Sequence, residues 1–348
     1  MKKSFLFLLL MVFGFCAPAG AAGQLVIFMW PDYLDPEVVS EFERDNDVKV
    51  KFNYYESNEE MAAKLQSGGV GQYDLVMPST YLLPSLKNLG LIQPLDQALL
   101  PNLENISQDF REMDVDPGNA YSVPYMWGIS GMAVGSLPEG ESVDATWGLI
   151  YDPAKRIGNF AILDNARDAL GGALKSLGYS LNSTDPAQIE EAARLLIEAK
   201  QSPNFLGFYG GVGSLEKILD GSAKVVQAYN SDSGRMAMES PGKINFILPQ
   251  EGGEIWADLL AIPAKAPNAE MAHKFINYTL EAEVAARIAA YNQSATPIEA
   301  AKAFIPAEDL NNTMMYPSGG VMKKVEYIKD LGPVNRIYDE AWSMIKAR

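Results

Sequence analysis

The chain has 348 residues, 48% of them hydrophobic, and a formal net charge of −16 at pH 7. So strong a negative charge disfavours nucleic acid and anionic membrane surfaces as partners and favours cations, although it also serves solubility. With one cysteine and one histidine, the chain offers too few ligands for a zinc site and no set of partners for a Ser-His-Asp triad. We therefore expect no metal or cofactor, and we place His273 on the surface of a helix.

The N-terminal segment, residues 1–22, carries two lysines, an unbroken apolar stretch that ends at Cys16, and then small residues. This three-part pattern predicts a signal peptide cleaved after Ala21 or Ala22. The apolar stretch is shorter than the roughly 20 residues of a membrane span, and Phe15 before the cysteine is unlike a lipoprotein signal. We expect an exported, periplasmic chain without cysteine, with a charge changed from −16 to −18 by loss of the two lysines, and long enough for two domains.

The first part of the mature chain alternates short apolar runs with helical patterns. Strands are predicted over 25–30, 48–55 and 73–78, and helices over 35–46, 57–67 and 79–89. Ser57 and Glu60 match a capping box at the start of the second helix. Strands and helices in alternation predict a parallel sheet covered by helices, so the fold class is α/β.

Two polar and aromatic segments follow predicted strands: "WPDY" at 30–33 and "PSTY" at 78–81. In parallel sheets ligands bind beyond the carboxyl ends of the strands. Both segments are therefore expected to face one crevice.

The second half continues in the same α/β style. Strands are predicted at 158–163, at 223–230, up to about 249 and over 256–263, and helices from 166, over 185–200, within 269–291 and over 333–348. The glycine-rich "GGVG" at 210–213 lacks P-loop spacing and is expected to form a turn. Since no long linker divides the chain, we expect it to cross between the two domains more than once and to leave a cleft.

Aromatic residues recur beside carboxylates at the predicted strand ends. The pairs are Trp30 with Asp32, Trp256 with Asp258, and Tyr229 with Asp232, and near Asn165 stand Asp164 and Asp168. Each pair also has an ordinary explanation. Asn165 with Asp168, and Ser231 or Asp232, are typical of helix caps, and Trp256 is typical of a core with Asp258 bonded to backbone.

Such a set suits a ligand with separated amines on an apolar chain. Aromatic faces cover methylenes and attract ammonium groups, each contact being worth roughly 0.5–2 kcal/mol. Carboxylates neutralise the ammonium groups, since burying a charge without a partner is very costly.

The chain resembles the bacterial periplasmic spermidine/putrescine-binding proteins, the solute receptors of polyamine ABC transporters. The matching stretches are "WPDYLDPEVVSEFE", "YYESNEEMAAKL", "YDLVMPSTYLL", "YSVPYMWGISGMAV", "LDNARDAL", "PQEGGEIWADLLAIP" and "IYDEAW". The resemblance implies a two-lobe periplasmic binding protein fold of type II, with the ligand cleft between lobes joined by crossing strands. It implies one lobe of residues 24–127 and 259–298 and another of residues 128–258 and 299–348.

The resemblance also implies the site residues. As walls it gives Trp30, Tyr33, Ser79, Tyr81, Tyr229 and Trp256, and as acids around the amines Asp32, Asp168, Asp232 and Asp258.

This sequence departs from the family pattern at four places. Pro31 replaces a hydroxyl residue, Asn165 replaces an aspartate of spermidine binders, and Ser294 stands where a tyrosine is usual, with Tyr291 nearby. The glutamine of spermidine binders has no clear counterpart near 327–328. The retained Asp32 and Asp232 favour a diamine.

The leading hypothesis is a monomeric periplasmic receptor, without catalysis, that delivers putrescine, spermidine or a close relative to the permease subunits of an ABC transporter. A polyamine-sensing adaptor that signals to a membrane protein would share the same site and differ only on its outer faces. An exported hydrolase with paired carboxylates is a third alternative, and it predicts turnover.

Overall fold

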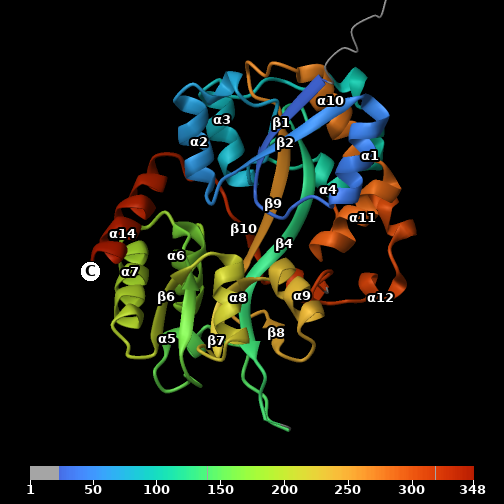
Figure 1. Ribbon diagram of the computed structural model, residues 1–348. Helices are drawn as coiled ribbons and strands as arrows, with labels where there is room; N and C mark the ends of the chain where they lie inside the picture. Colours follow the sequence, from blue (N-terminus) through green and yellow to red (C-terminus); the bar gives the residue numbers. More distant parts are fainter. Residues whose placement is uncertain (1–22, 139, 318) are drawn as a thin grey trace, which may run out of the picture.

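A computed structural model describes residues 23–138, 140–317 and 319–348. The predicted signal peptide lies outside the described residues. Two α/β lobes, one drawn mainly in blue and orange and the other mainly in green and yellow, are joined by long strands that run from one lobe into the other (Figure 1).

Three parallel strands form the sheet of the first lobe: β1 (Gly23–Met29), β2 (Val48–Tyr54) and β3 (Leu75–Val76). β1 pairs with both of the others, as the alternation of strands and helices predicts. The segment after β1 and the segment after β3 therefore emerge at the same edge of the sheet.

The helices between these strands are α1 (Pro36–Asn46), α2 (Asn58–Gln66) and α3 (Leu83–Asn88). At the start of α2 the Ser57 side chain accepts from the Glu60 N–H, but the Glu60 carboxylate reaches the N–H of Glu56, so only half of the predicted capping box forms. The helix predicted over 79–89 is divided into a 3₁₀ turn and α3. Pro84 stands in the first turn of α3, where a residue without an N–H is tolerated.

The lobes are joined by two long antiparallel strands, β4 (Ser122–Gly135) and β9 (Glu254–Ala261). They unite the strands of both lobes in the order β2-β1-β3-β9-β4-β7-β5-β6, with β8 paired to β4 and β10 to β9. β4 was not predicted. Its Pro124 cannot donate to a ladder, and the register of the pair shifts between Pro124 and Met126.

The second lobe is built on β5, which lies parallel to β6 and β7. Its elements are α5 (Gly148–Tyr151), β5 (Phe160–Leu163), α6 (Ala166–Ser176), α7 (Pro186–Lys200), β6 (Phe205–Tyr209), α8 (Gly211–Leu219), β7 (Val225–Tyr229), α9 (Asn230–Glu239) and β8 (Ile244–Ile247). The prediction of a turn at 210–213 is wrong, because α8 begins there. Burial of Leu215 and Ile218 on one face of α8 outweighs the low helix propensity of glycine.

The other elements cover the two lobes. They are α4 (Gln108–Arg111), α10 (Ala269–Thr279), α11 (Ala282–Asn292), α12 (Ala307–Leu310), α13 (Gly319–Met322), β10 (Glu326–Tyr327) and α14 (Asn335–Ala347). Short 3₁₀ helices lie at Gly69–Gly71, Thr80–Leu82, Gln97–Leu99, Pro101–Asn105, Glu299–Phe304 and Gly332–Val334. The C-terminal helix α14, predicted over 333–348, packs on α6 and α7 of the second lobe.

The buried side chains divide between the lobes. One large core combines residues from 25–126 with residues from 256–305, and another combines residues from 132–225 with residues from 338–345. Ala301 and Ile305 pack in the first of these cores, although the predicted boundary assigns residues after 298 to the second lobe. The lobe boundaries themselves stay a prediction.

The expected surface position of His273 is wrong, since only 5% of the residue is exposed. Its Nε2 accepts from the Asp96 N–H at 2.9 Å and its Nδ1 faces the Ala269 carbonyl at 2.7 Å. Helical spacing alone does not identify this buried bond, because its partner lies 177 positions away.

Across the part of the chain that the structure describes, no helix is long and apolar enough to span a membrane.

Candidate ligand-binding site

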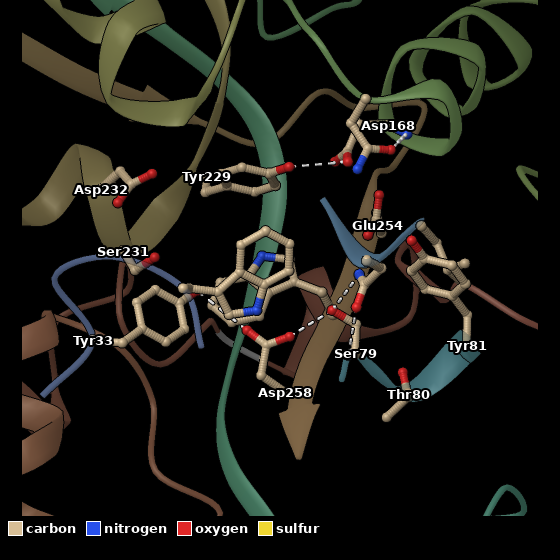
Figure 2. A pocket seen from close by; sticks show the side chains of 15 residues that line it. Tyr33, Ser79, Thr80, Tyr81, Asp168, Tyr229, Ser231, Asp232, Glu254 and Asp258 are labelled. Atoms are coloured by element: carbon tan, nitrogen blue, oxygen red, sulfur yellow. Dashed lines mark hydrogen bonds between the residues drawn. The ribbon is translucent and has the colours of Figure 1, made fainter. Parts of the chain in front are cut away.

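A cavity lies where the carboxyl ends of the strands of both lobes meet the crossing strand β9 (Figure 2). Its walls come from the segments after β1, β2, β3, β5, β7 and β10 and from one face of β9. The lining residues are Trp30, Tyr33, Asn58, Ser79, Thr80, Tyr81, Asn165, Asp168, Tyr229, Ser231, Asp232, Glu254, Trp256, Asp258 and Ile328.

Nine of the ten predicted site residues line this cavity, and the exception is Asp32. Asp32 is exposed on the turn after β1, and its φ of +57° is in the left-handed region that few non-glycine residues adopt. Its carboxylate is close enough to raise the pKa of Asp232. Asp32 therefore lies outside the lining and acts on the site through charge.

Asp258 is the carboxylate that the first lobe holds most firmly. On its oxygens it accepts from the Ser79 hydroxyl at 2.6 Å and from the Tyr33 hydroxyl at 3.2 Å. Asn58 fixes Ser79 in turn, by donating from Nδ2 to its Oγ and by accepting from its N–H, both at 3.0 Å. Asp258 is thus oriented by side chains, and the ordinary explanation of a backbone bond is not needed.

Burial dominates the electrostatics of Asp258, which is only 3% exposed. It raises the pKa of this carboxyl to about 6, against the opposing hydrogen bonds from Ser79 and Tyr33. At neutral pH Asp258 is therefore a buried carboxylate, which a bound cation would stabilise.

Asp168 and Glu254 face each other at another part of the cavity (Figure 2). Asp168 accepts from the Ser130 hydroxyl and from the Tyr229 hydroxyl, each at 3.0 Å, and it borders the same two cavities as Glu254. Burial raises the pKa of both carboxyls, and the charge of Asp168 raises that of Glu254 further.

Asn165 uses its side-chain oxygen to cap α6 through the N–H groups of Arg167 and Asp168, so the capping interpretation is confirmed for Asn165.

Asp232 lies in the first turn of α9, and no side-chain hydrogen bond caps that helix. The capping interpretation of Ser231 or Asp232 is therefore wrong. The partner of Asp232 is Arg235, with 3.5 Å between nitrogen and oxygen. Burial raises the pKa of Asp232, Arg235 opposes the rise, and Asp32 adds to it.

Aromatic faces separate these carboxyls. Trp256 and Tyr229 meet edge to face, with their ring centroids 6.1 Å apart, and Trp30 lies at 65° to Tyr55, with centroids 4.5 Å apart. Trp256 crosses β4 at Gly128, where an added Cβ would stand 2.4 Å from its ring. The Nε1 of Trp256 is buried and has no acceptor among the described residues.

Some cavity residues were not predicted, above all Glu254. It stands two positions before Trp256 and four before Asp258, so the alternation of a strand places all three on one face. Extending that alternation by one step would have found it. Asn58, Thr80 and Ile328 carry no comparable signal, and neither Tyr291 nor Ser294 lines the cavity.

The cavity thus holds four carboxyls between aromatic walls: Asp168, Asp232, Glu254 and Asp258. Among the described residues, Arg235 is the only cation that forms an ion pair with any of them. Within the described ranges, this cavity included, no group of three His, Cys, Asp or Glu side chains is placed to hold a metal ion. The fold and the cavity define a two-lobe solute-binding protein whose site favours a cation with an apolar chain.

Comparison with known proteins gives the family. The model described as bacterial extracellular solute-binding protein matches residues 37–313, and the chain belongs to that family.

Individual relatives agree with this assignment. The chain is 35% identical over 335 residues to the spermidine/putrescine-binding periplasmic protein of Escherichia coli, with 95% of this chain and 94% of the relative covered. It is 31% identical over 343 residues to the putrescine/cadaverine-binding protein of Pseudomonas aeruginosa, with coverage of 95% and 96%. The solved spermidine/putrescine ABC transporter substrate-binding protein PotD of Streptococcus pneumoniae superposes with a TM-score of 0.78 at 30% identity, with coverage of 93% and 99%. These similarities confirm the predicted resemblance and the predicted fold class.

Proposed function

We propose that the protein is a periplasmic receptor that binds an acyclic polyamine in the cavity and delivers it to the permease subunits of an ABC transporter. The observation that carries the proposal is the alternation of buried carboxyls with aromatic faces in one cavity between two lobes. Relatives named as spermidine/putrescine-binding or putrescine/cadaverine-binding proteins support the choice of ligand. The predicted signal peptide and relatives described as periplasmic support export.

Within this proposal each group has a role. The ammonium groups pair with Asp258, with Asp232 and with the Asp168 carboxyl, which are separate positions around the cavity. The indoles of Trp30 and Trp256 cover the methylenes between these positions, where contact with an aromatic face also attracts the charge. Asp32 strengthens the negative potential near Asp232 without touching the ligand.

Binding without turnover distinguishes a receptor from a hydrolase. Titration calorimetry of the mature protein with putrescine, spermidine and norspermidine should give saturable heat with at least one of them. Mass spectrometry of ligand recovered after prolonged incubation should find it unchanged. The absence of heat with all three would refute the choice of ligand, and a chemically altered ligand would refute the receptor role.

A further inference from the structure

Asp168 and Glu254 are two acids that line the same two cavities, and among the described residues neither forms an ion pair. Both residues line the cavity and are only 5% and 7% exposed. Burial raises the pKa of both carboxyls, and the charge of Asp168 raises the pKa of Glu254 further. Two buried carboxylates that border the same space cannot both ionise without a large cost. We therefore expect the pair, before ligand binds, to hold one proton and one negative charge.

The nearby cations do not replace that proton. Arg167 lies near enough to lower the pKa of both carboxyls, but its guanidinium donates to the Lys329 carbonyl and the Asn182 side chain, each at 3.0 Å. Lys175 on α6 borders the small space behind the pair, and its Nζ pairs with Glu326 of β10.

The neighbouring acidic and phenolic groups do not lower the pKa of Glu254. Asp258 on the same strand raises its pKa, while the Tyr229 hydroxyl bonds to Asp168 and not to Glu254. Among the described residues, no N–H or hydroxyl group donates a hydrogen bond to the Glu254 side chain. Glu254 is thus a carboxyl more than nine-tenths buried that faces the cavity with acceptor positions unused.

We propose that Glu254 is a ligand-binding residue, and that with Asp168 it forms one subsite whose shared proton is exchanged for a protonated amine of the ligand. The inference rests on the proposed function and adds to it a residue and a chemical step.

The exchange balances in charge and in hydrogen bonds. The amine arrives as an ammonium group, its N–H donors bond to Asp168 and Glu254, and the shared proton leaves to solvent. The subsite carries one negative charge before the exchange and one after it, because two carboxylates and one ammonium replace two carboxyls that share one proton. Binding at this subsite therefore does not require an additional buried charge.

Proton release is measurable by calorimetry in buffers that differ in ionisation enthalpy. We suggest pH 7.5, where Asp258, with its pKa of about 6, is already ionised and contributes little. The expected result is the release of about one proton per polyamine bound by the unaltered protein. Affinity should also rise with pH above neutrality, by at most about tenfold per unit for one linked proton, until the amines themselves lose protons.

The variant Glu254→Gln keeps the shape of the side chain and removes the titrating group. It should release almost no proton, and its affinity should depend little on pH. Asp168→Asn should behave in the same way, which guards against a peculiarity of one substitution. Glu270→Gln is the matched control, because Glu270 is exposed on α10 and pairs only with Lys274.

The outcomes separate the inference from the proposed function. If the unaltered protein binds a polyamine but releases no proton, or if Glu254→Gln releases as many protons, the subsite is refuted and the receptor role stands. If no polyamine gives heat with the unaltered protein, the receptor role fails, and the subsite fails with it. Circular dichroism and thermal unfolding of each variant show that a lost proton signal does not come from a lost fold.

Discussion

Replacing Asp258 with asparagine should move affinity and stability in opposite directions. The substitution keeps the shape of the side chain; the amide oxygen accepts from the Ser79 hydroxyl, and the amide NH2 faces the Tyr33 hydroxyl, whose oxygen can accept from it. It removes a carboxylate whose pKa is raised to about 6 from an ordinary value of 3.8. Because the folded protein binds this proton more tightly than the unfolded chain does, the ionised form costs stability as the pH rises.

The size of the stability change follows from that shift. A rise in the pKa from 3.8 to about 6 corresponds to about 3 kcal/mol of stability lost once the pH is well above 6. At pH 5 only part of the loss has developed, about 1.5 kcal/mol by the same linkage. Asp258→Asn should therefore raise the free energy of unfolding of the empty protein by up to about 3 kcal/mol at pH 8 and by about half as much at pH 5.

Affinity should fall in the same variant. Removing one partner of a buried, hydrogen-bonded charge pair costs about 2–5 kcal/mol of binding, which is roughly 30-fold to several thousandfold in Kd. Urea unfolding at the two pH values gives the stability change, and calorimetric titration gives the affinity. The exposed Glu270→Gln serves as the control and should change neither.

A structural role for Asp258 gives the opposite result for stability. If the carboxylate served mainly to fasten Ser79 and Tyr33, Asp258→Asn would lower the free energy of unfolding at both pH values. Such a loss, or an affinity within threefold of the unaltered protein, would refute the reasoning.

Two further changes test the supports of the site. Tyr229→Phe removes the hydroxyl that donates to Asp168 at 3.0 Å. Because a lost bond to a charged acceptor is worth about 1.5–3 kcal/mol, calorimetry should show polyamine affinity reduced at least tenfold. An unchanged Kd would contradict this role. Gly128→Ala places a Cβ 2.4 Å from the Trp256 ring, so overpacking should cost about 1–3 kcal/mol in urea unfolding and weaken binding by displacing the indole. Gly213→Ala, which meets only ordinary contacts on α8, is its control, and equal behaviour of the two variants would refute the crowding argument.

Local sequence patterns were sufficient to predict most strands and helices of the first lobe. The strands β1 and β2 and the helices α1 and α2 were predicted from alternation, from helical spacing and from caps such as Ser57, all of which are encoded within a few residues. The long strand β4 was missed because proline and glycines interrupt its pattern. Pairing with β9, more than 100 positions later in the sequence, stabilises it.

The site was predictable where its residues follow a period or a family motif. Trp256 and Asp258 were identified, and Glu254 on the same face of the strand was not, because an isolated glutamate after glycines is typical of a turn. Asp32 was predicted as a cavity acid, but the structure places it on an exposed turn with a positive φ. The direction of that side chain depends on the backbone conformation of a single residue, and spacing in the sequence does not determine it.

The two indoles of the cavity give the site intrinsic fluorescence. Only Trp30 and Trp256, of the five tryptophans in the chain, line the cavity. Trp127 packs beside Phe110 in the first lobe, Trp147 is buried in the second lobe, and Trp342 packs on Phe208 near the C-terminus. An ammonium group brought against an excited indole alters its emission, so the unlabelled protein carries its own reporter of occupancy, and replacing the other three tryptophans with phenylalanine would remove a constant background.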